Sequence, residues 1–134
     1  MRVAMETAVY SHLAGGTALT ALLAAGSASI YYGRPTPGIA APYLVWKVVL
    51  DEPTNATPAD ERPLLLDIRG IDDDPETAAR IGDAIEARMK TAIDVTGWDT
   101  VHQRMMAAVE MIEDRDGKPV YHDGGRFQIE LHQL

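Results

Sequence analysis

Residues 64–93, with the sequence LLLDIRGIDDDPETAARIGDAIEARMKTAI, decide the fold because a strand pattern is followed at once by a helix pattern. Residues 64–70 have strand character. The acidic run 72–74 followed by Pro75 is a typical helix start, since aspartate caps free N–H groups and proline fits the first turn. Within 75–93, apolar residues form one stripe, which predicts a helix that packs on a sheet. The stripe consists of Ala78, Ile81, Ile85, Met89 and Ala92.

Further strands are indicated on both sides of this segment. Residues 43–50, YLVWKVVL, are β-branched or aromatic with one charge, so they predict a central strand that buries Trp46. A short strand at 29–32 precedes it. Two more strands are predicted at 101–112 and 126–134, with a hairpin signal at Asp116-Gly117 between them. The run Asp123-Gly124-Gly125 predicts a flexible break before the last strand.

The first 26 residues predict a helical hairpin. A helix over 3–13 ends at Gly15-Gly16, and Thr17 is expected to cap a second helix over 18–25 that Gly26 ends. The residues on one face of the first helix are Val3, Ala4, Ala8, Val9, His12 and Leu13. The expected fold is therefore α+β, with an antiparallel sheet of about four to five strands. One long amphipathic helix and the N-terminal hairpin pack on it, in a single domain over 1–134.

Composition narrows the classes of function. With 134 residues, 46% hydrophobic and 24% charged, the chain should fold as one globular domain. A net charge of −8 argues against a surface that grips duplex DNA. The chain has no cysteine, which excludes disulfides, thiolate metal sites and thiol catalysis. An apolar stretch at 13–25 imitates a secretory signal, but nearby polar residues and glycines interrupt it, so we expect neither a signal nor a membrane span.

Chemical sites have weak support in the sequence. The acidic run 72–74 lacks the ligand spacing of a calcium loop and is explained as a helix cap. His102 and His132 would face each other in one register of the last hairpin, without an evident third ligand. Metal-dependent nuclease chemistry would require clustered acids near a lysine, and only Asp67, Glu86 and Lys90 could be imagined to converge in this way. We therefore expect no catalytic, cofactor-binding or metal residues.

Four features in order carry a resemblance to a known family. They are N-terminal helices ending before Ile30-Tyr31, a proline-bearing loop leading into PYLVW at 42–46, the strand at 64–69 with its following helix, and the closing Tyr121-His122 with FQIEL at 127–131. In this order they resemble the bacteriophage tail-completion or tail-terminator proteins, which are structural and not enzymes. The resemblance spans nearly the whole chain.

The resemblance implies a homohexameric ring on the head-proximal end of a tail tube. Such a ring ends tube polymerisation and joins the tail to the head connector or stopper protein, with DNA only passing through its lumen. It would be assembled in the bacterial cytoplasm as part of a phage, a prophage-derived particle or a gene transfer agent. The residues alone leave two alternatives open, a small cytoplasmic α+β binding or regulatory domain and a metal-dependent hydrolase.

Exposed loops are the expected contact regions of such a subunit. The proline-bearing loops at 34–41 and 51–63 are long and polar, and the hairpin turn near 116 is exposed. We expect these loops to reach neighbouring subunits or the tube. The predicted interface residues are Arg34, Thr36, Asp51, Glu52, Asn55, Asp60, Glu61, Arg62, Arg115, Asp116 and Lys118.

Overall fold

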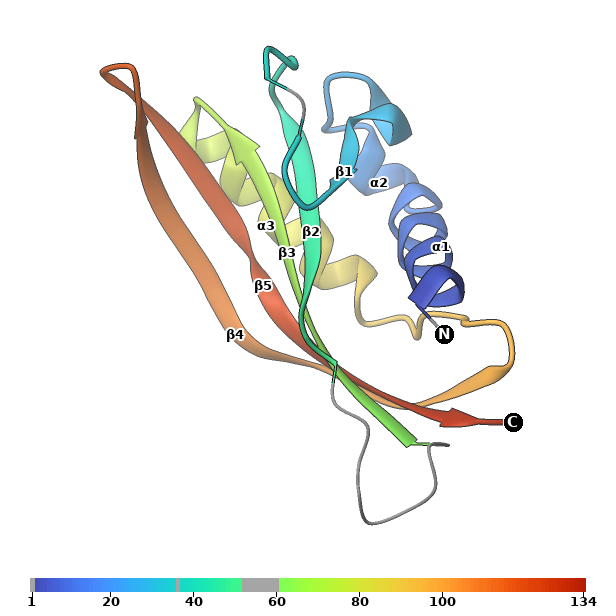
Figure 1. Ribbon diagram of the computed structural model, residues 1–134. Helices are drawn as coiled ribbons and strands as arrows, with labels where there is room; N and C mark the ends of the chain where they lie inside the picture. The colour runs from blue at the N-terminus through green and yellow to red at the C-terminus, as the bar shows by residue number, and fades with distance from the viewer. Residues whose placement is uncertain (1, 36, 52–60) are drawn as a thin grey trace.

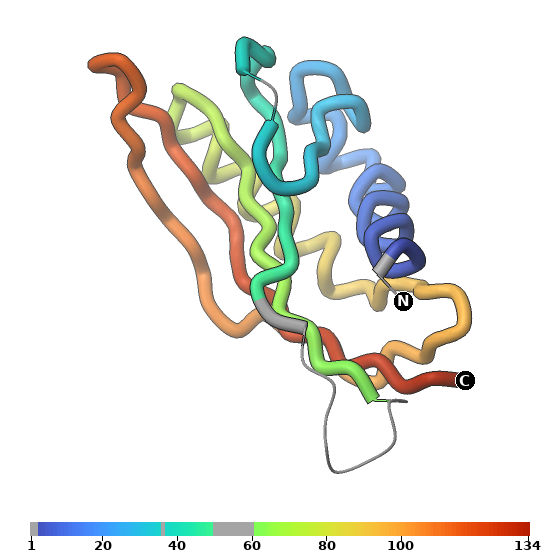
Figure 2. The backbone as a smooth tube through the Cα atoms, in the orientation of Figure 1, coloured from blue at the N-terminus to red at the C-terminus, as the bar shows by residue number. Residues whose placement is uncertain are grey.

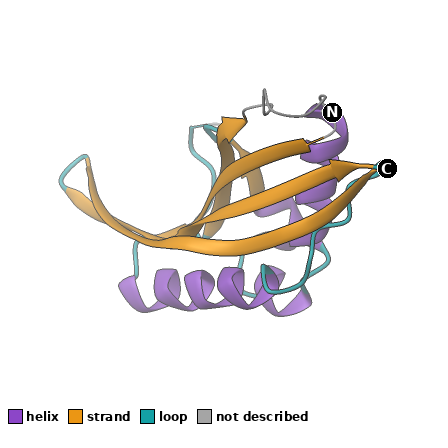
Figure 3. Cartoon of the chain, turned by 90° about the horizontal axis from the view of Figure 1, so that it is seen from below, coloured by secondary structure: helices purple, strands orange, loops and turns teal. Residues whose placement is uncertain are grey.

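The computed structural model describes residues 2–35, 37–51 and 61–134, which form a curved five-stranded sheet with its helices packed on one face (Figures 1 and 3). The strand order is β1-β2-β3-β5-β4. The first helix and the last strand reach the same end of the molecule (Figure 2). The elements are α1 (Arg2–Ala14), α2 (Thr17–Thr20), η1 (Gly26–Ser29), β1 (Ile30–Tyr32), β2 (Tyr43–Asp51), β3 (Glu61–Asp72), α3 (Pro75–Arg88), β4 (Trp98–Arg115) and β5 (Lys118–Gln133).

The sheet is mixed, and the α+β class is confirmed. β2, β3, β5 and β4 pair antiparallel, but the short β1 runs parallel to β2, which the sequence analysis did not expect. β2 extends to Asp51 and β3 begins at Glu61, so the loop predicted for 51–63 was wrong at residue 51 and at 61–63, and 52–60 lie outside the described residues. Pro63 is tolerated there because it lies beyond the last pair that β2 and β3 form among the described residues.

The start of α3 is as predicted, and its end is not. Asp74 is the N-cap, and its carboxylate accepts a hydrogen bond from the Thr77 N–H at 3.0 Å. The helix ends at Arg88, five residues before the predicted end. The Gln103 side chain explains this, because it donates to the Met89 carbonyl at 2.7 Å and accepts from the Ile93 N–H at 3.0 Å. These bonds replace helical ones and hold the following segment against the sheet.

The N-terminal helical hairpin is only partly confirmed. α1 matches the prediction, except that Val3 is 77% exposed and Met5 takes its place in the core. The predicted second helix is reduced to the single turn of α2, with Gly16 as its N-cap instead of Thr17. The N–H groups of Ala24 and Ala25 bond elsewhere, to the carbonyl of Pro42 and the hydroxyl of Ser29. Residues 21–25 therefore cannot continue the helix.

A reciprocal pair of hydrogen bonds joins α1 to the end of α3. The His12 ring Nε2 lies 3.0 Å from the Arg88 carbonyl, and the Arg88 Nε donates to the His12 carbonyl at 2.7 Å. Gly16 makes room for this arrangement, since a Cβ there would lie 2.9 Å from Arg88 Cδ. Both helices are thereby fixed on the same face of the sheet.

The β4–β5 hairpin turns at the predicted residues. Asp116 and Gly117 both have left-handed backbone angles, with φ of 53° and 80°, as a two-residue type I′ turn requires. The predicted flexible break was wrong, because β5 runs without interruption from Lys118 to Gln133. A Cβ on Gly124 would meet the backbone of β3, and one on Gly125 would lie 2.7 Å from the Met105 methyl carbon. These glycines therefore permit close strand packing.

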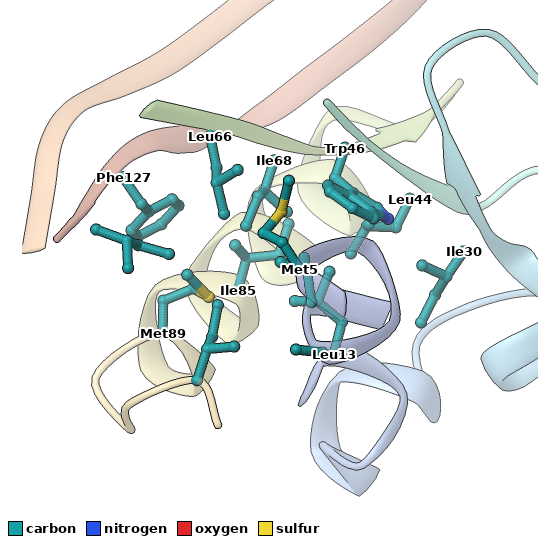
Figure 4. Packing of buried hydrophobic residues seen from close by; sticks show 14 of the residues in the cluster. Met5, Leu13, Ile30, Leu44, Trp46, Leu66, Ile68, Ile85, Met89 and Phe127 are labelled. Carbon is teal, nitrogen blue, oxygen red and sulfur yellow. The ribbon is translucent and has the colours of Figure 1, made fainter. Parts of the chain in front are cut away.

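The core lies between the helices and one face of the sheet (Figure 4). Leu66, Ile68 and Phe127 contribute from the sheet, and the buried sides of α1 and α3 cover them. Trp46 is buried on β2 as predicted, although β3 is the middle strand. Because side chains alternate along a strand, Asp67 and its neighbours at alternate positions point to the opposite face, which we call the open face. Within the described residues, no helix is long and apolar enough to cross a membrane.

Candidate assembly interface

A cluster of cations surrounds one buried acid at the centre of the open face. Asp67 is buried and accepts two hydrogen bonds from Arg69, at 2.7 and 2.9 Å, and a longer contact from Arg126 at 3.4 Å. Lys47 lies opposite Asp67 on β2. The bond to Asp67 raises the pKa of Arg69. With one acid against three cations, this area is positive although the chain carries a net charge of −8.

The hydrolase constellation considered from the sequence is not assembled. Asp67 faces the open side of the sheet, where arginines bind its carboxylate. Glu86 lies on the exposed side of α3, which packs on the other face of the sheet, and Lys90 follows the end of that helix. The structure therefore separates the three residues that metal-dependent nuclease chemistry would have needed together.

A polar network fixes the tip of the β4–β5 hairpin. Arg115 donates to both oxygens of Glu113, at 3.0 and 3.2 Å, and to the Tyr43 hydroxyl on β2 at 2.9 Å. The His122 Nε2 lies 2.8 Å from Glu113 Oε1, the oxygen that also accepts a hydrogen bond from an Arg115 terminal nitrogen. Arg115, followed by His122, holds the pKa of Glu113 below its ordinary value. These side-chain bonds therefore fix the position of the hairpin tip relative to β2.

A cleft of about 320 Å³ lies beside this network. Arg34 and its neighbours from the loop after β1 line one wall, and Tyr43, Glu113 and Arg115 line the other. Two predicted interface residues from distant parts of the sequence, Arg34 and Arg115, thus meet at one place. Asp116 and Lys118 are exposed at the adjacent hairpin tip, which extends beyond α3 (Figure 3).

The remaining predicted interface residues lie elsewhere. Asp51 is the last residue of β2, and Glu61 and Arg62 begin β3 at the end of the sheet far from the hairpin tip (Figure 1). The other four lie outside the described residues. They are Thr36, Glu52, Asn55 and Asp60. Where described, the predicted residues therefore gather at two opposite ends of the sheet.

One group of possible metal ligands is present at the Glu61 end. Ligand atoms of Glu61, Glu130 and His132 lie within 4.8 Å of one another, and all three side chains are partly exposed. The His132 Nε2 lies 3.0 Å from Glu130 Oε1, and this hydrogen bond accounts for the closeness of the two side chains without a metal ion. The histidine pair considered from the sequence is not formed, because His102 lies opposite Glu130 and His132 opposite Asp99.

A second cleft, of about 600 Å³, separates the start of α3 from the hairpin. Asp123 lines it, and burial together with the charges of Glu110 and Asp83 raises the pKa of its carboxyl to about 6. The sequence carries no signal for this group, since its neighbours come from three different elements. Folding therefore places the Asp123 carboxyl group in an environment that disfavours its ionised form.

We expect the Asp123→Asn variant to be more stable than the parent chain at neutral pH. The folded-state pKa of about 6 lies above the ordinary value of 3.8, so ionisation costs stability as the pH rises between these two values. The gain in melting temperature should be small near pH 4 and should increase up to about pH 7, where the aspartate is charged in both states.

Thermal unfolding followed by circular dichroism at a series of pH values measures this gain. Glu86→Gln, which removes an exposed carboxylate from α3, is the matched control and should show no comparable pH dependence. A gain for Asp123→Asn that is equal at pH 4 and pH 7 would contradict the assigned environment.

β4 forms one edge of the sheet over 18 residues and has no strand on its outer side among the described residues. Its register with β5 is irregular near Thr100 and Met105, while 107–112 pair regularly. Several large apolar side chains on this strand face solvent, which is unusual for a long edge, because unpaired edges attract other strands. They are Val101, Met106, Met111 and Ile112.

The described surface has several features of the kind that other proteins bind. They include an uncovered sheet face, open clefts and a long edge strand with exposed apolar groups. Residues 7–118 match the family described as "Tail completion protein gp17", and the chain belongs to this family. It is therefore a structural protein of a phage-type tail.

Solved structures contain the same fold. A chain in the structure described as "Virion of native gene transfer agent (GTA) particle" superposes with a TM-score of 0.67 at 17% sequence identity. The similarity covers 92% of this chain and 91% of that one. No curated protein sequence matches the chain.

Proposed function

We propose that this chain forms a hexameric ring on the head-proximal end of a tail tube, where it stops tube polymerisation and joins the tail to the head connector. The observation that carries the proposal is the family match over residues 7–118. The association surfaces of the structure support it, because a ring subunit needs contacts with its neighbours as well as with partners above and below. DNA passes through the lumen.

The positions of the predicted interface residues suit a subunit that connects two partners. Arg34, Arg115 and Lys118 lie at the hairpin end of the sheet, and Glu61 and Arg62 lie at the opposite end. We assign one end to the tail tube and the other to the connector. The rigid β-sheet between them keeps the two contact regions at a fixed separation.

Deleting the gene from the phage or particle-producing strain should yield tails of irregular length and heads without tails. Nothing would then end tube growth or present the connector with a surface to bind. Electron microscopy of the released particles measures tail length and the fraction of heads that carry tails. Tails of uniform length on most heads in the deletion strain would overturn the proposal.

Complementation tests the hairpin end separately. Wild-type protein supplied from a plasmid should restore joined particles, whereas Lys118→Glu at the hairpin tip should restore fewer. Lys90→Glu is the matched control, because it makes the same Lys-to-Glu charge reversal at an exposed position just after α3. Both variants should stay within about 0.5 kcal/mol of the parent in unfolding free energy, as surface substitutions usually do. Equal restoration by both would remove the hairpin tip from the contact.

A further inference from the structure

Large exposed apolar side chains gather at two opposite edges of the sheet. Besides the four along β4, a second group lies on α1, β1 and β2, and Leu134 stands apart. Two members of the second group, Tyr10 and Tyr32, line the same shallow cleft. The second group consists of Val3, Tyr10, Tyr32 and Val49. A single copy thus exposes two separate apolar patches.

Both edges also have strand positions free to pair. β1 pairs with β2 only from Leu44 to Trp46, so β2 beyond Trp46 has no paired strand on its outer side among the described residues. This stretch of β2 contains an irregularity in its register with β3, between Val48 and Leu50. On the other edge, 107–112 of β4 are regular and unpaired on their outer side. Free N–H and C=O groups on both edges can continue the same sheet into a second molecule.

The exposed side chains on the two edges match on the helix side of the sheet. Ile112, 70% exposed, points to the helix side of the sheet, as do Tyr10 and Tyr32 on the opposite edge. Met111 points to the open face, where Arg69 donates to its sulfur at 3.8 Å. Val49 is the unpaired residue at the irregularity of β2, and both side chains are 41% exposed. A sheet continued from one copy to the next would therefore place apolar groups against each other on its helix side.

Charge favours contact between unlike edges. In and beside residues 107–112, β4 exposes Glu110 and Asp114, and the exposed Arg115 is paired with Glu113. The other edge, in contrast, exposes Lys47 and, in the loop after β1, Arg34. Two copies joined through β4 alone would bring like charges together and leave the second patch uncovered, because like charges on adjacent strands repel. Joining β4 to the β2 edge covers both patches and pairs opposite charges.

We propose that copies of this chain associate head to tail, with residues 107–112 of β4 in one copy added to the outer edge of β2, beyond Trp46, in the next. Because the two patches differ, the contact is heterologous, and repetition gives a ring when the rotation closes. The closure of the contact into a ring rests on the proposed function. The contact between two copies does not, and it should form in the purified protein.

Cysteine cross-linking tests the contact directly, because the chain has no cysteine of its own. Met111→Cys and Val49→Cys are single surface substitutions on the two edges. Under mild oxidation of concentrated protein, a mixture of the two variants should give a disulfide-linked dimer, and neither variant alone should do so. The double variant should give a ladder of linked multimers. Glu86→Cys mixed with Val49→Cys is the matched control and should remain unlinked.

Each other result overturns the inference. Dimers from Met111→Cys alone would show a two-fold contact through β4. A mixture that links no better than the control would remove these edges from any association, whatever native mass light scattering reports. The deletion experiment tests the terminator role separately. If the cysteine variants cross-link but the deletion strain makes normal tails, the contact is supported and the terminator role is rejected. If they do not cross-link but the deletion strain makes defective tails, the terminator role is supported and the contact is rejected.

Discussion

Replacing Trp46 with alanine should lower the free energy of unfolding by about 3–5 kcal/mol, as truncation of a buried tryptophan usually does. Trp46 is 2% exposed and belongs to the cluster that joins β2 to α1. The Tyr32 ring packs edge-on against it with 4.7 Å between centroids. Alanine would leave a cavity beneath β2 that the rigid sheet cannot close.

Urea unfolding followed by circular dichroism measures this loss. Val49→Ala is the matched control on the same strand, because the Val49 side chain is exposed and its truncation should change the stability by no more than about 0.5 kcal/mol. A loss for Trp46→Ala as small as that of the control would contradict the buried position of Trp46. Such a result would also contradict the packing of α1 against β2, because α1 contacts the same cluster.

The elements predictable from the sequence are those whose causes are local. The Asp74 cap, the proline after it and the apolar stripe of α3 all lie within a few turns of one another. The turn at Asp116-Gly117 is likewise determined by two residues that tolerate left-handed angles. Such features need no knowledge of the rest of the chain, and the structure confirms them.

The wrong predictions concern features that distant residues decide. α3 ends early because Gln103, on β4, bonds to the residues after it. The second helix fails because Pro42 and Ser29 compete for its N–H groups. The parallel direction of β1 depends on the path of the loop after it. Neither periodicity nor propensity contains this information, since both describe only neighbours along the chain.

In the candidate interface, too, the features with local causes were predictable and those that depend on the strand order were not. Polar, proline-bearing loops were predicted as contact regions from exposure alone, and Arg34 and Arg115 do meet at one cleft. The apolar edges were missed, because Met111 and Ile112 lie in a strand whose position in the sheet a periodic pattern cannot reveal. Only the strand order shows that β4 is an edge and that its side chains remain uncovered.

Replacing Gly124 with alanine should lower the free energy of unfolding by about 3 kcal/mol or more, at the upper end of the cost of overpacking. The added Cβ would meet the Ile68 carbonyl oxygen and lie 2.8 Å from Arg69 Cα. Both obstacles are backbone atoms of the neighbouring strand, which cannot rotate away. β5 would have to move off β3 at the middle of the sheet, which also disturbs the contact of Asp123 with Gly82 on α3.

Gly97→Ala is the matched control, because Gly97 has a left-handed φ of 85° but no atom within 4 Å of an added Cβ. It should cost only the backbone strain of alanine in that region, about 1–2 kcal/mol. Denaturant unfolding of both variants compares the two costs. A smaller loss for Gly124→Ala than for Gly97→Ala would mean that β5 yields at this point, as the flexible break predicted from the sequence would allow. A larger loss would show that Gly124 permits the close contact between β5 and β3.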